Sequence, residues 1–306
     1  MGRFSPQRDP TLGAIVDTAR ARGHDVVVLD IADLVRGPCR LVPTSATLCL
    51  GEGEAIELGR LDVLYLGPLP SSAARLAPSG QQLRSEAWDG LQKQQAARHV
   101  LGWSIASCAE AAGVPVLSSP TKARPFDHKP FQLAALAAAG IAVPPTIVGD
   151  HDDDDDHDDD DEHDHRERIV KPLLGGPVVV SSSYGPVAGV PMLWQPRLRG
   201  AQLRLAVVGG VVVAAASLTL EEGCVDSRLS ASVWEPTPVT SALRALGARC
   251  AEVCAYDVCA IDAVETAAGC VVLDVNRTPQ LLDLALECGV DIAGRCVDLL
   301  EARARR

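Results

Sequence analysis

Features that are scarce in this sequence exclude several classes of protein. Residues 1–9 contain no hydrophobic segment, so we expect no signal peptide. The most apolar stretch, residues 207–216, is interrupted by Gly209 and Gly210, whereas a membrane-spanning helix needs about 20 apolar residues. We therefore expect a cytoplasmic protein without a membrane partner. Aromatic residues make up only 3% of the chain, so alanine and valine must fill most of the core.

Three common motifs are also missing. The ten cysteines include no Cys-x-x-Cys pair, so we expect reduced, buried thiols, with a zinc site as the minor alternative. No Gly-x-Gly-x-x-Gly run follows a strand-like segment, which excludes the dinucleotide-binding fingerprint. No broad basic stripe accompanies the net charge of −12, so nucleic acid is not an expected partner.

Much of the negative charge lies in one run, residues 151–168, where histidines interrupt blocks of aspartate. Such a run repels itself and buries nothing, so we expect a solvated loop between two strands. Imidazoles and carboxylates in alternation also bind divalent cations, which leaves metal binding as the alternative. We favour a low-complexity insertion at 151–165 whose removal leaves the fold and any catalysis intact.

The rest of the composition is that of a globular protein. The 306 residues are 47% hydrophobic and 22% charged, which suits about two domains with substantial cores. In the N-terminal part, helical patterns at 9–23 and 81–113 alternate with strand-like runs at 26–30, 61–66 and 114–117. This alternation favours an α/β domain with a mainly parallel sheet.

Near the C-terminus, two apolar runs at 256–265 and 270–279 flank turn residues and predict an antiparallel hairpin. Asp274 and Asn276 are two residues apart and point to one face. Asp262 joins them if the register is right. Two carboxylates and an amide oxygen suit Mg²⁺, with Mn²⁺ as a substitute, and without a cation the facing carboxylates would repel. The alternative is that these acids face water at the strand ends.

Two motifs in this region carry a resemblance to a known family. Residues 273–279 read Leu-Asp-Val-Asn-Arg-Thr-Pro, and residues 289–293 read Gly-Val-Asp-Ile-Ala. The first is similar to the hydrophobic-Glu-Val-Asn-x-x-Pro strand, and the second to the closing helix, of RimK-like ATP-grasp carboxylate–amine ligases. The resemblance implies an α/β (α+β grasp) fold. It comprises an N-terminal pre-ATP-grasp α/β domain at 1–119 and a two-lobed ATP-grasp domain at 120–306.

Two lysines lie where the family binds the phosphates of ATP. Lys129 follows a capping-type Asp127 and precedes a helix and a Gly-Ile-Ala-Val-Pro-Pro-Thr run similar to the family pattern. Its alternative is an ordinary surface position. Lys171 lies in an Ile-Val-Lys-Pro run that resembles the strand of the second ATP lysine. Gly175 and Gly176 are the remnant of a loop whose backbone N–H groups hold phosphate in the family.

The resemblance extends to the segment between the lobes. Gln195 and Leu198 lie in the linker that binds adenine in the family, although Pro196 removes one backbone N–H there. Arg204 matches an arginine that faces the phosphates or acyl phosphate, and pairing with a nearby acid is the alternative. Arg228 lies where the family contacts substrate or nucleotide, which makes it a candidate clamp for a carboxylate.

The resemblance implies an ATP- and Mg²⁺-dependent ligase. In such an enzyme ATP phosphorylates a carboxylate and an amine attacks the acyl phosphate, while cations balance the phosphate charge. A phosphate-transfer enzyme that stops after the first step is also compatible. Two other hypotheses stay open: a degenerate ATP-grasp protein that binds nucleotide or a peptide partner, and a metal-storing protein. The expected partners are small-molecule or peptide carboxylates and amines, and a homo-oligomer is compatible with the sequence.

Overall fold

The computed structural model describes residues 9–30, 39–50, 54–67, 85–149, 168–173, 179–180, 191–219 and 233–304. The sequence predictions for Gly175, Gly176, Arg228 and the acidic insertion at 151–165 concern residues outside these ranges.

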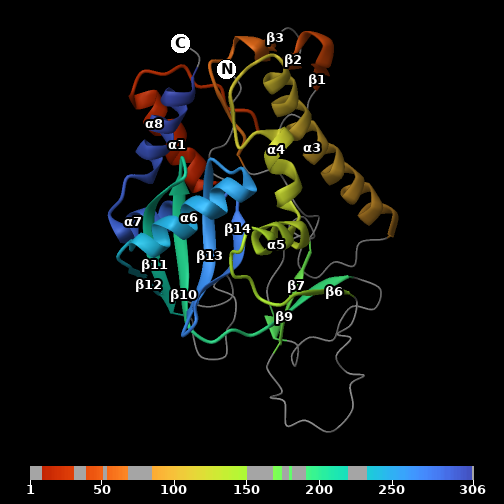
Figure 1. Cartoon of the computed structure of the whole chain (residues 1–306). Coiled ribbons are helices and arrows are strands. Elements are labelled where there is room, and N and C mark those ends of the chain that lie inside the picture. The colour runs from red at the N-terminus through yellow and green to blue at the C-terminus, as the bar shows by residue number, and fades with distance from the viewer. Residues whose placement is uncertain are drawn as a thin grey trace.

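The centre of the molecule is a five-stranded antiparallel sheet with the strand order β12-β11-β10-β13-β14 (Figure 1). Its strands are β10 Ala201–Val208, β11 Val211–Thr219, β12 Val233–Pro236, β13 Val258–Thr266 and β14 Gly269–Asn276. Gly209 and Gly210 turn β10 into β11 with φ angles of 59° and 77°, which are the left-handed conformations that a tight hairpin requires. The predicted C-terminal hairpin is confirmed as β13 and β14.

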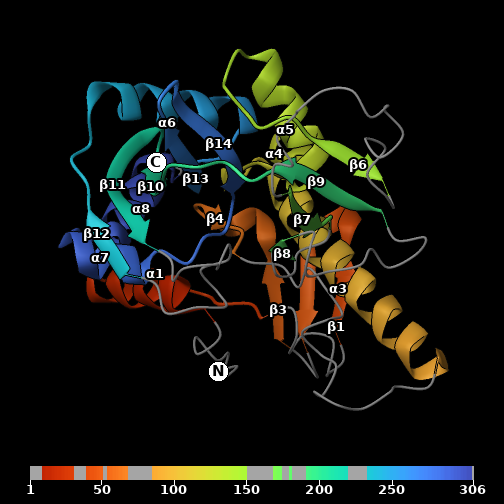
Figure 2. The same cartoon turned by 90° about the horizontal axis from the view of Figure 1, so that it is seen from below.

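Helices cover both faces of this sheet (Figure 2). Helix α6, Ser241–Cys254, packs on one face through a core that includes Leu205 and Ile261. Gly247 allows its close approach, because a Cβ there would lie 2.2 Å from a methyl group of Val212. The opposite face is covered by α1 Pro10–Ala21, α7 Leu282–Cys288 and α8 Ile292–Arg303.

Helix α1 begins and ends as the sequence predicts. The Asp9 carboxylate accepts hydrogen bonds from the N–H groups of Thr11 and Leu12, and Gly23 follows the helix with a φ of 87°. Arg22, at the end of α1, contacts Asp298 of α8 at 2.7 Å. The first helix therefore belongs to the same layer as the last one (Figure 1).

The rest of the N-terminal part agrees with the prediction only in part. The strands predicted at 61–66 and 114–117 are confirmed as β4 Leu64–Tyr65 and β5 Val116–Leu117, which pair in parallel, and the helix predicted at 81–113 as α3 Ser85–Ala111. Among the described N-terminal strands, this is the one parallel pair. The region also contains an unpredicted antiparallel meander of β1 Cys39–Val42, β2 Thr47–Leu50 and β3 Glu54–Glu57, with short 3-10 helices η2 Pro43–Ser45 and η3 Leu58–Arg60. The strand predicted at 26–30 is wrong, since this segment joins no sheet and Val27 is 52% exposed.

A second, four-stranded sheet has the order β6-β9-β7-β8. Its strands are β6 Ile147–Gly149, β7 Arg168–Pro172, β8 Val179–Val180 and β9 Met192–Pro196. Both β6 and β7 pair antiparallel with β9, on opposite sides of it, and therefore run parallel to each other. The expected linker around Gln195 is thus largely a central strand of this sheet.

Helix α5, Lys129–Ala138, lies between the β14 edge of the large sheet and the small sheet (Figure 2). The chain reaches it through α4 Pro120–Ala123 and the 3-10 helix η5 Arg124–Asp127. Asp127 does not cap α5, because the N-cap position is occupied by His128. The His128 side chain makes no capping hydrogen bond. Within the described ranges, no helix is long and apolar enough to cross a membrane.

Candidate functional site

The structure brings Asp262, Asp274 and Asn276 together on one face of the β13–β14 hairpin. Asp262 lies directly opposite Asp274 in the register, so the condition set by the sequence is met. The Asn276 amide Nδ2 donates a hydrogen bond of 3.0 Å to Asp262 Oδ2. Three oxygen-bearing side chains therefore converge on one spot of an otherwise apolar sheet.

This spot lies on the sheet face that α1, α7 and α8 cover elsewhere. Ala206 of β10 and Ala260 of β13 pack into the core beneath those helices. Arg204 lies two residues before Ala206 and Asp262 two residues after Ala260, so both point to the same face as these alanines. The side chains of Asp262 and Asp274 keep 32% and 16% of their surface exposed, so the charged face lies beyond the helices and is reachable.

Each carboxylate already has a cation beside it. The Lys129 ammonium lies 2.9 Å from Asp274 Oδ2, and the Arg204 guanidinium lies 3.6 Å from Asp262 Oδ1. The contact with Asp262 is the acid pairing that the sequence left as the alternative for Arg204. The Arg204 guanidinium also lies 5.8 Å from the ring centroid of Trp234.

The two carboxyl groups differ in acidity because their surroundings differ. Burial raises the pKa of Asp262, and the neighbouring Asp274 charge adds to this, so the opposing effect of Arg204 is outweighed. Burial also acts on Asp274, but Lys129, Lys171 and Arg204 together hold its pKa below the ordinary value. The negative charge at Asp262 is therefore the less compensated of the two.

Lys171 reaches the site from the small sheet, and Gln195 lies on the same face of that sheet. Lys171 is only 6% exposed, and its charge is felt at both Asp262 and Asp274. Ile169 pairs with Gln195 and Lys171 pairs with Leu193, so Lys171 and Gln195 share one face. The opposite face is apolar. Leu198, three residues after Gln195, is half-buried beyond the end of β9.

Two buried polar atoms without a partner among the described residues are of interest here: Arg204 Nε at the site, and Gln195 Oε1 on the Lys171 face of the small sheet. The other two such atoms, Arg98 Nε and Glu110 Oε2, lie on α3. Gln195 Nε2 donates to Thr146 Oγ1 at 2.9 Å, and that hydroxyl donates its only proton to the Pro144 carbonyl. Flipping the amide would break this chain of bonds, so the oxygen is the orphan. A buried acceptor and a buried cationic donor without partners are costly in a finished core and suit a ligand.

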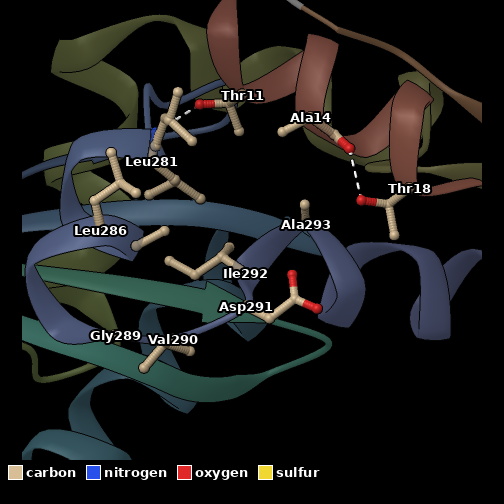
Figure 3. A pocket seen from close by; sticks show the side chains of 12 residues that line it. Thr11, Ala14, Thr18, Leu281, Leu286, Gly289, Val290, Asp291, Ile292 and Ala293 are labelled. Carbon is tan, nitrogen blue, oxygen red and sulfur yellow. Dashed lines mark hydrogen bonds between the residues drawn. The ribbon is translucent and has the colours of Figure 1, made fainter.

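A cavity beside α1, α7 and α8 lacks a comparable group of paired charges. It has a volume of about 400 Å³ and is mainly apolar (Figure 3). Its polar side chains are occupied: Thr18 donates to Ala14, while Thr11 and Asp291 accept backbone N–H groups. Across the described ranges, no three His, Cys, Asp or Glu side chains are grouped to hold a metal, and the described cysteines are free thiols.

Sequence reasoning missed two buried polar residues next to the site. Gln132 of α5 is 2% exposed, and Arg277, directly after Asn276, is 7% exposed. The signal for Gln132 was a lone amide in an otherwise apolar helix. The signal for Arg277 was a charge directly after the Asp-Val-Asn motif, but neither signal identifies a partner.

Comparison with known proteins was made at the level of domain, sequence and fold. The RimK-like ATP-grasp domain matches residues 196–300. A "Probable alpha-L-glutamate ligase" of Stenotrophomonas maltophilia (strain K279a) is 33% identical over 181 residues, covering 54% of this chain and 62% of the relative. Another, of Thioalkalivibrio sulfidiphilus (strain HL-EbGR7), is 38% identical over 107 residues, covering 35% of this chain and 36% of the relative. The chain thus spans less than two thirds of the length of these relatives.

Solved structures cover nearly the whole chain. The ATP-grasp ligase PsnB, solved with a minimal precursor, is similar with a TM-score of 0.76 and 24% identity over 98% of this chain and 96% of PsnB. The macrocyclase MdnC of Microcystis aeruginosa MRC, bound with precursor peptide MdnA, has a TM-score of 0.71 and 15% identity over 98% and 97%. The expected ATP-grasp fold and the resemblance to the RimK-like branch are confirmed.

Proposed function

We propose that this ATP-grasp chain is an ATP- and Mg²⁺-dependent ligase that joins a carboxylate to an amine through an acyl phosphate. One observation carries the proposal: two facing carboxylates and three cations, Lys129, Lys171 and Arg204, meet on one partly exposed face. A charged cluster of this kind matches the needs of a metal-bound triphosphate, in which cations meet phosphates and carboxylates meet the metal.

The residues present fit Mg²⁺. Asp262, Asp274 and the Asn276 amide offer oxygen ligands on one surface, and Asp262 is the carboxylate whose charge is least compensated. Mg²⁺, when bound, would draw phosphate oxygens together and offset their charge. The Asn276 amide nitrogen donates to Asp262, so the side chain would present its oxygen to a metal only after rotating about its amide.

The cations exchange partners when nucleotide binds. Lys129 and Arg204 now lie beside carboxylates, and they would be the groups to bind the phosphates once Asp262 and Asp274 held the metal. Arg204 Nε, which lacks a partner among the described residues, gains an anionic acceptor. Gln195 Oε1, the orphan acceptor, suits a donor such as the amino group of adenine.

Catalysis then rests on positioning and charge. The γ-phosphate is held in line with the substrate carboxylate, whose oxygen attacks phosphorus and displaces ADP. The amine next attacks the acyl carbon, inorganic phosphate leaves and an amide forms. Lys129, Lys171 and Arg204 offset the negative charge that develops on the transferred group, and no protein residue needs to form a covalent bond.

The comparisons suggest where to look for substrates. The curated relatives carry the name alpha-L-glutamate ligase, and PsnB and MdnC were each solved with a precursor peptide. We therefore propose a peptide as one substrate, and an amino acid such as L-glutamate as a first candidate for the amine.

Equilibrium binding of a non-hydrolysable ATP analogue, with and without Mg²⁺, tests the nucleotide part of the proposal. We expect saturable binding that tightens with Mg²⁺ and weakens at least about 10-fold in Lys171→Met, which removes a phosphate-facing charge. Lys122→Met, at an exposed lysine of α4, is the matched control and should bind normally. No binding at millimolar analogue would overturn the proposal.

Release of ADP in the presence of peptides and amino acids tests the ligase part. We expect turnover that requires both a carboxylate and an amine and that yields an amide product by mass spectrometry. Nucleotide binding without turnover on any pool would favour the degenerate, non-catalytic protein. ADP release that needs the carboxylate alone, with a stable phosphorylated product, would favour a phosphate-transfer enzyme.

A further inference from the structure

The edge of β14 is joined to the start of α5 by side chains rather than by another strand. The Val275 N–H donates to Gln132 Oε1 at 2.9 Å, and Gln132 Nε2 donates to the Val275 carbonyl at 2.7 Å. One amide thus satisfies both backbone groups of an edge residue, as a neighbouring strand would. Val275 lies between Asp274 and Asn276, so this pair of bonds fixes the backbone that carries two proposed metal ligands.

A second link lies just beyond the metal-binding strand. Arg277 contacts Asp127 through two of its nitrogens, at 3.1 and 3.4 Å, in the fork-to-carboxylate geometry that fixes orientation as well as distance. Asp127 is two residues before Lys129, and it also accepts a hydrogen bond from the Tyr256 hydroxyl at 3.2 Å. Arg277 therefore ties the end of β14 to the segment that carries the phosphate lysine.

Arg277 also reaches into the N-terminal part of the chain. Its Nη1 donates to the Leu66 carbonyl at 3.1 Å, and its guanidinium lies 4.9 Å from the ring centroid of the buried Trp103. One buried side chain, directly after the β13–β14 hairpin, thus contacts both the N-terminal region and η5, the segment just before α5. A buried ion pair contributes little net stability compared with apolar packing, so its value here lies in geometry.

We infer that Asp127, Gln132 and Arg277 form a positioning latch that holds Lys129 in register with Asp274 and Asn276. The inference rests on the proposed function. In that function Lys129 leaves Asp274 for a phosphate and Asp274 turns to the metal, so their direct 2.9 Å contact is lost at the moment when their spacing matters. The latch bonds do not involve the proposed ligands' side chains and persist through this exchange.

The latch is tested by the Mg²⁺ concentration that gives half-maximal binding of a non-hydrolysable ATP analogue, measured beside the melting temperature. Partners that hydrogen-bond a metal ligand directly are worth about 10- to 100-fold in metal affinity. The latch acts one step further out, on the backbone that carries the ligands, so for Arg277→Met we expect a rise near the lower end of that range, about 10-fold. Arg277→Lys keeps the charge but not the fork, so its rise should be smaller. Gln132→Met, which removes both bonds to Val275, should behave like Arg277→Met.

Arg22→Met is the matched control. Arg22 also combines carboxylate contacts, at 2.7 and 3.3 Å, with a backbone carbonyl contact, but it lies on α1 away from the site. We expect it to change the melting temperature only. A purely structural Arg277 would do the same, so a folded Arg277→Met with wild-type Mg²⁺ dependence would overturn the latch.

Two further outcomes are decisive. If Arg277→Met does not fold, Arg277→Lys and Gln132→Met carry the test, and normal Mg²⁺ dependence in both would overturn the inference. If the wild-type protein binds no nucleotide at any Mg²⁺ concentration, the proposed function is wrong, and the inference that rests on it is overturned as well. Mg²⁺-dependent binding by wild type that is weakened in the latch variants and unchanged in Arg22→Met supports both.

Discussion

At the scale of single residues, the two facing carboxylates are held by cations rather than left to repel. Lys129 lies 2.9 Å from Asp274, and the pKa of that carboxyl is lowered although burial alone would raise it. The sequence indicated repulsion between Asp262 and Asp274, and the register does place them opposite each other. The sequence thus led us to expect that the Asp274 charge destabilises the protein, whereas the neighbouring cations make that charge favourable.

The variant Asp274→Asn should therefore lose stability in the absence of ligand. It leaves the Lys129 ammonium without its carboxylate, and we expect the free energy of unfolding to fall by about 1 kcal/mol, since both side chains are partly exposed. Urea unfolding without nucleotide measures this. Mg²⁺-dependent nucleotide binding should fail in the same variant, whereas Asp274→Glu should retain it. Increased stability of Asp274→Asn would mean that repulsion between the carboxylates dominates.

Residue types at the site followed from the sequence, but their partners did not. Asp262, Asp274 and Asn276 could be placed on one face because strand periodicity is local. Asp127, interpreted as a capping residue, instead binds Arg277 far along the chain. Such contacts depend on how separate elements pack, and no pattern within one element encodes them.

At the scale of elements, prediction succeeded where the pattern was long or the turn chemistry was specific. Helix α1 has both a capping aspartate and a terminal glycine, and the β13–β14 hairpin has alternating faces. The strand prediction for residues 26–30 failed because strand formation depends on a neighbouring strand. These residues have no such neighbour within the described part of the chain. The β1–β3 meander was missed because its strands are short and mostly half-buried.

The buried cysteines of α6 and α8 make the fold sensitive to alkaline pH. Burial raises the pKa of Cys250, Cys254 and Cys296 from 9.0 to about 12. These thiols stay protonated when folded, while the unfolded chain ionises above pH 9. Their contribution to stability is thus complete below pH 9 and is lost as the pH rises toward 12.

We expect the free energy of unfolding, measured with urea under reducing conditions, to fall steadily from pH 9 upward. Cys250→Ala should be less stable than wild type at pH 8 because it leaves a small cavity, yet its decline with pH should be shallower. If the free energy of unfolding of Cys250→Ala fell with pH as steeply as that of wild type, ionisation of Cys250 would not contribute to the loss of stability above pH 9.

At the scale of the whole molecule, the chain's two ends share one core. Ile15 and Ala19 of α1 pack in the same cluster as Ile292 and Val297 of α8. The boundary predicted at residue 119 stays a prediction, but α1 already lies against the sheet that carries the candidate site. Truncation at that boundary would expose this face, so the large sheet should be studied with α1 attached.

The order of the small sheet sets a minimum reach for the connection between β6 and β7. Gly149 lies beside Met192 at one end of β9, and Arg168 lies beside Pro196 at the other end, on the opposite side. The chain must therefore cross two strand spacings, about 9–10 Å, and run back about 13 Å along β9, a separation of roughly 16 Å. An extended chain covers at most about 3.3–3.6 Å per residue.

The connection between β6 and β7 therefore needs a minimum length, whatever its charge. Deleting all of 151–165 leaves only residues 150, 166 and 167 between the strands. The four Cα-to-Cα steps from Gly149 to Arg168 then reach at most about 14 Å, so β6 or β7 should detach and the melting temperature should drop. Deleting 153–162 leaves ample slack and should be tolerated. The sequence predicted that all of 151–165 could be removed without loss of the fold. We now expect that the acidic side chains are dispensable but that part of the segment's length is required. Equal melting temperatures for the two deletions in metal-free buffer would show that the crossing is not needed.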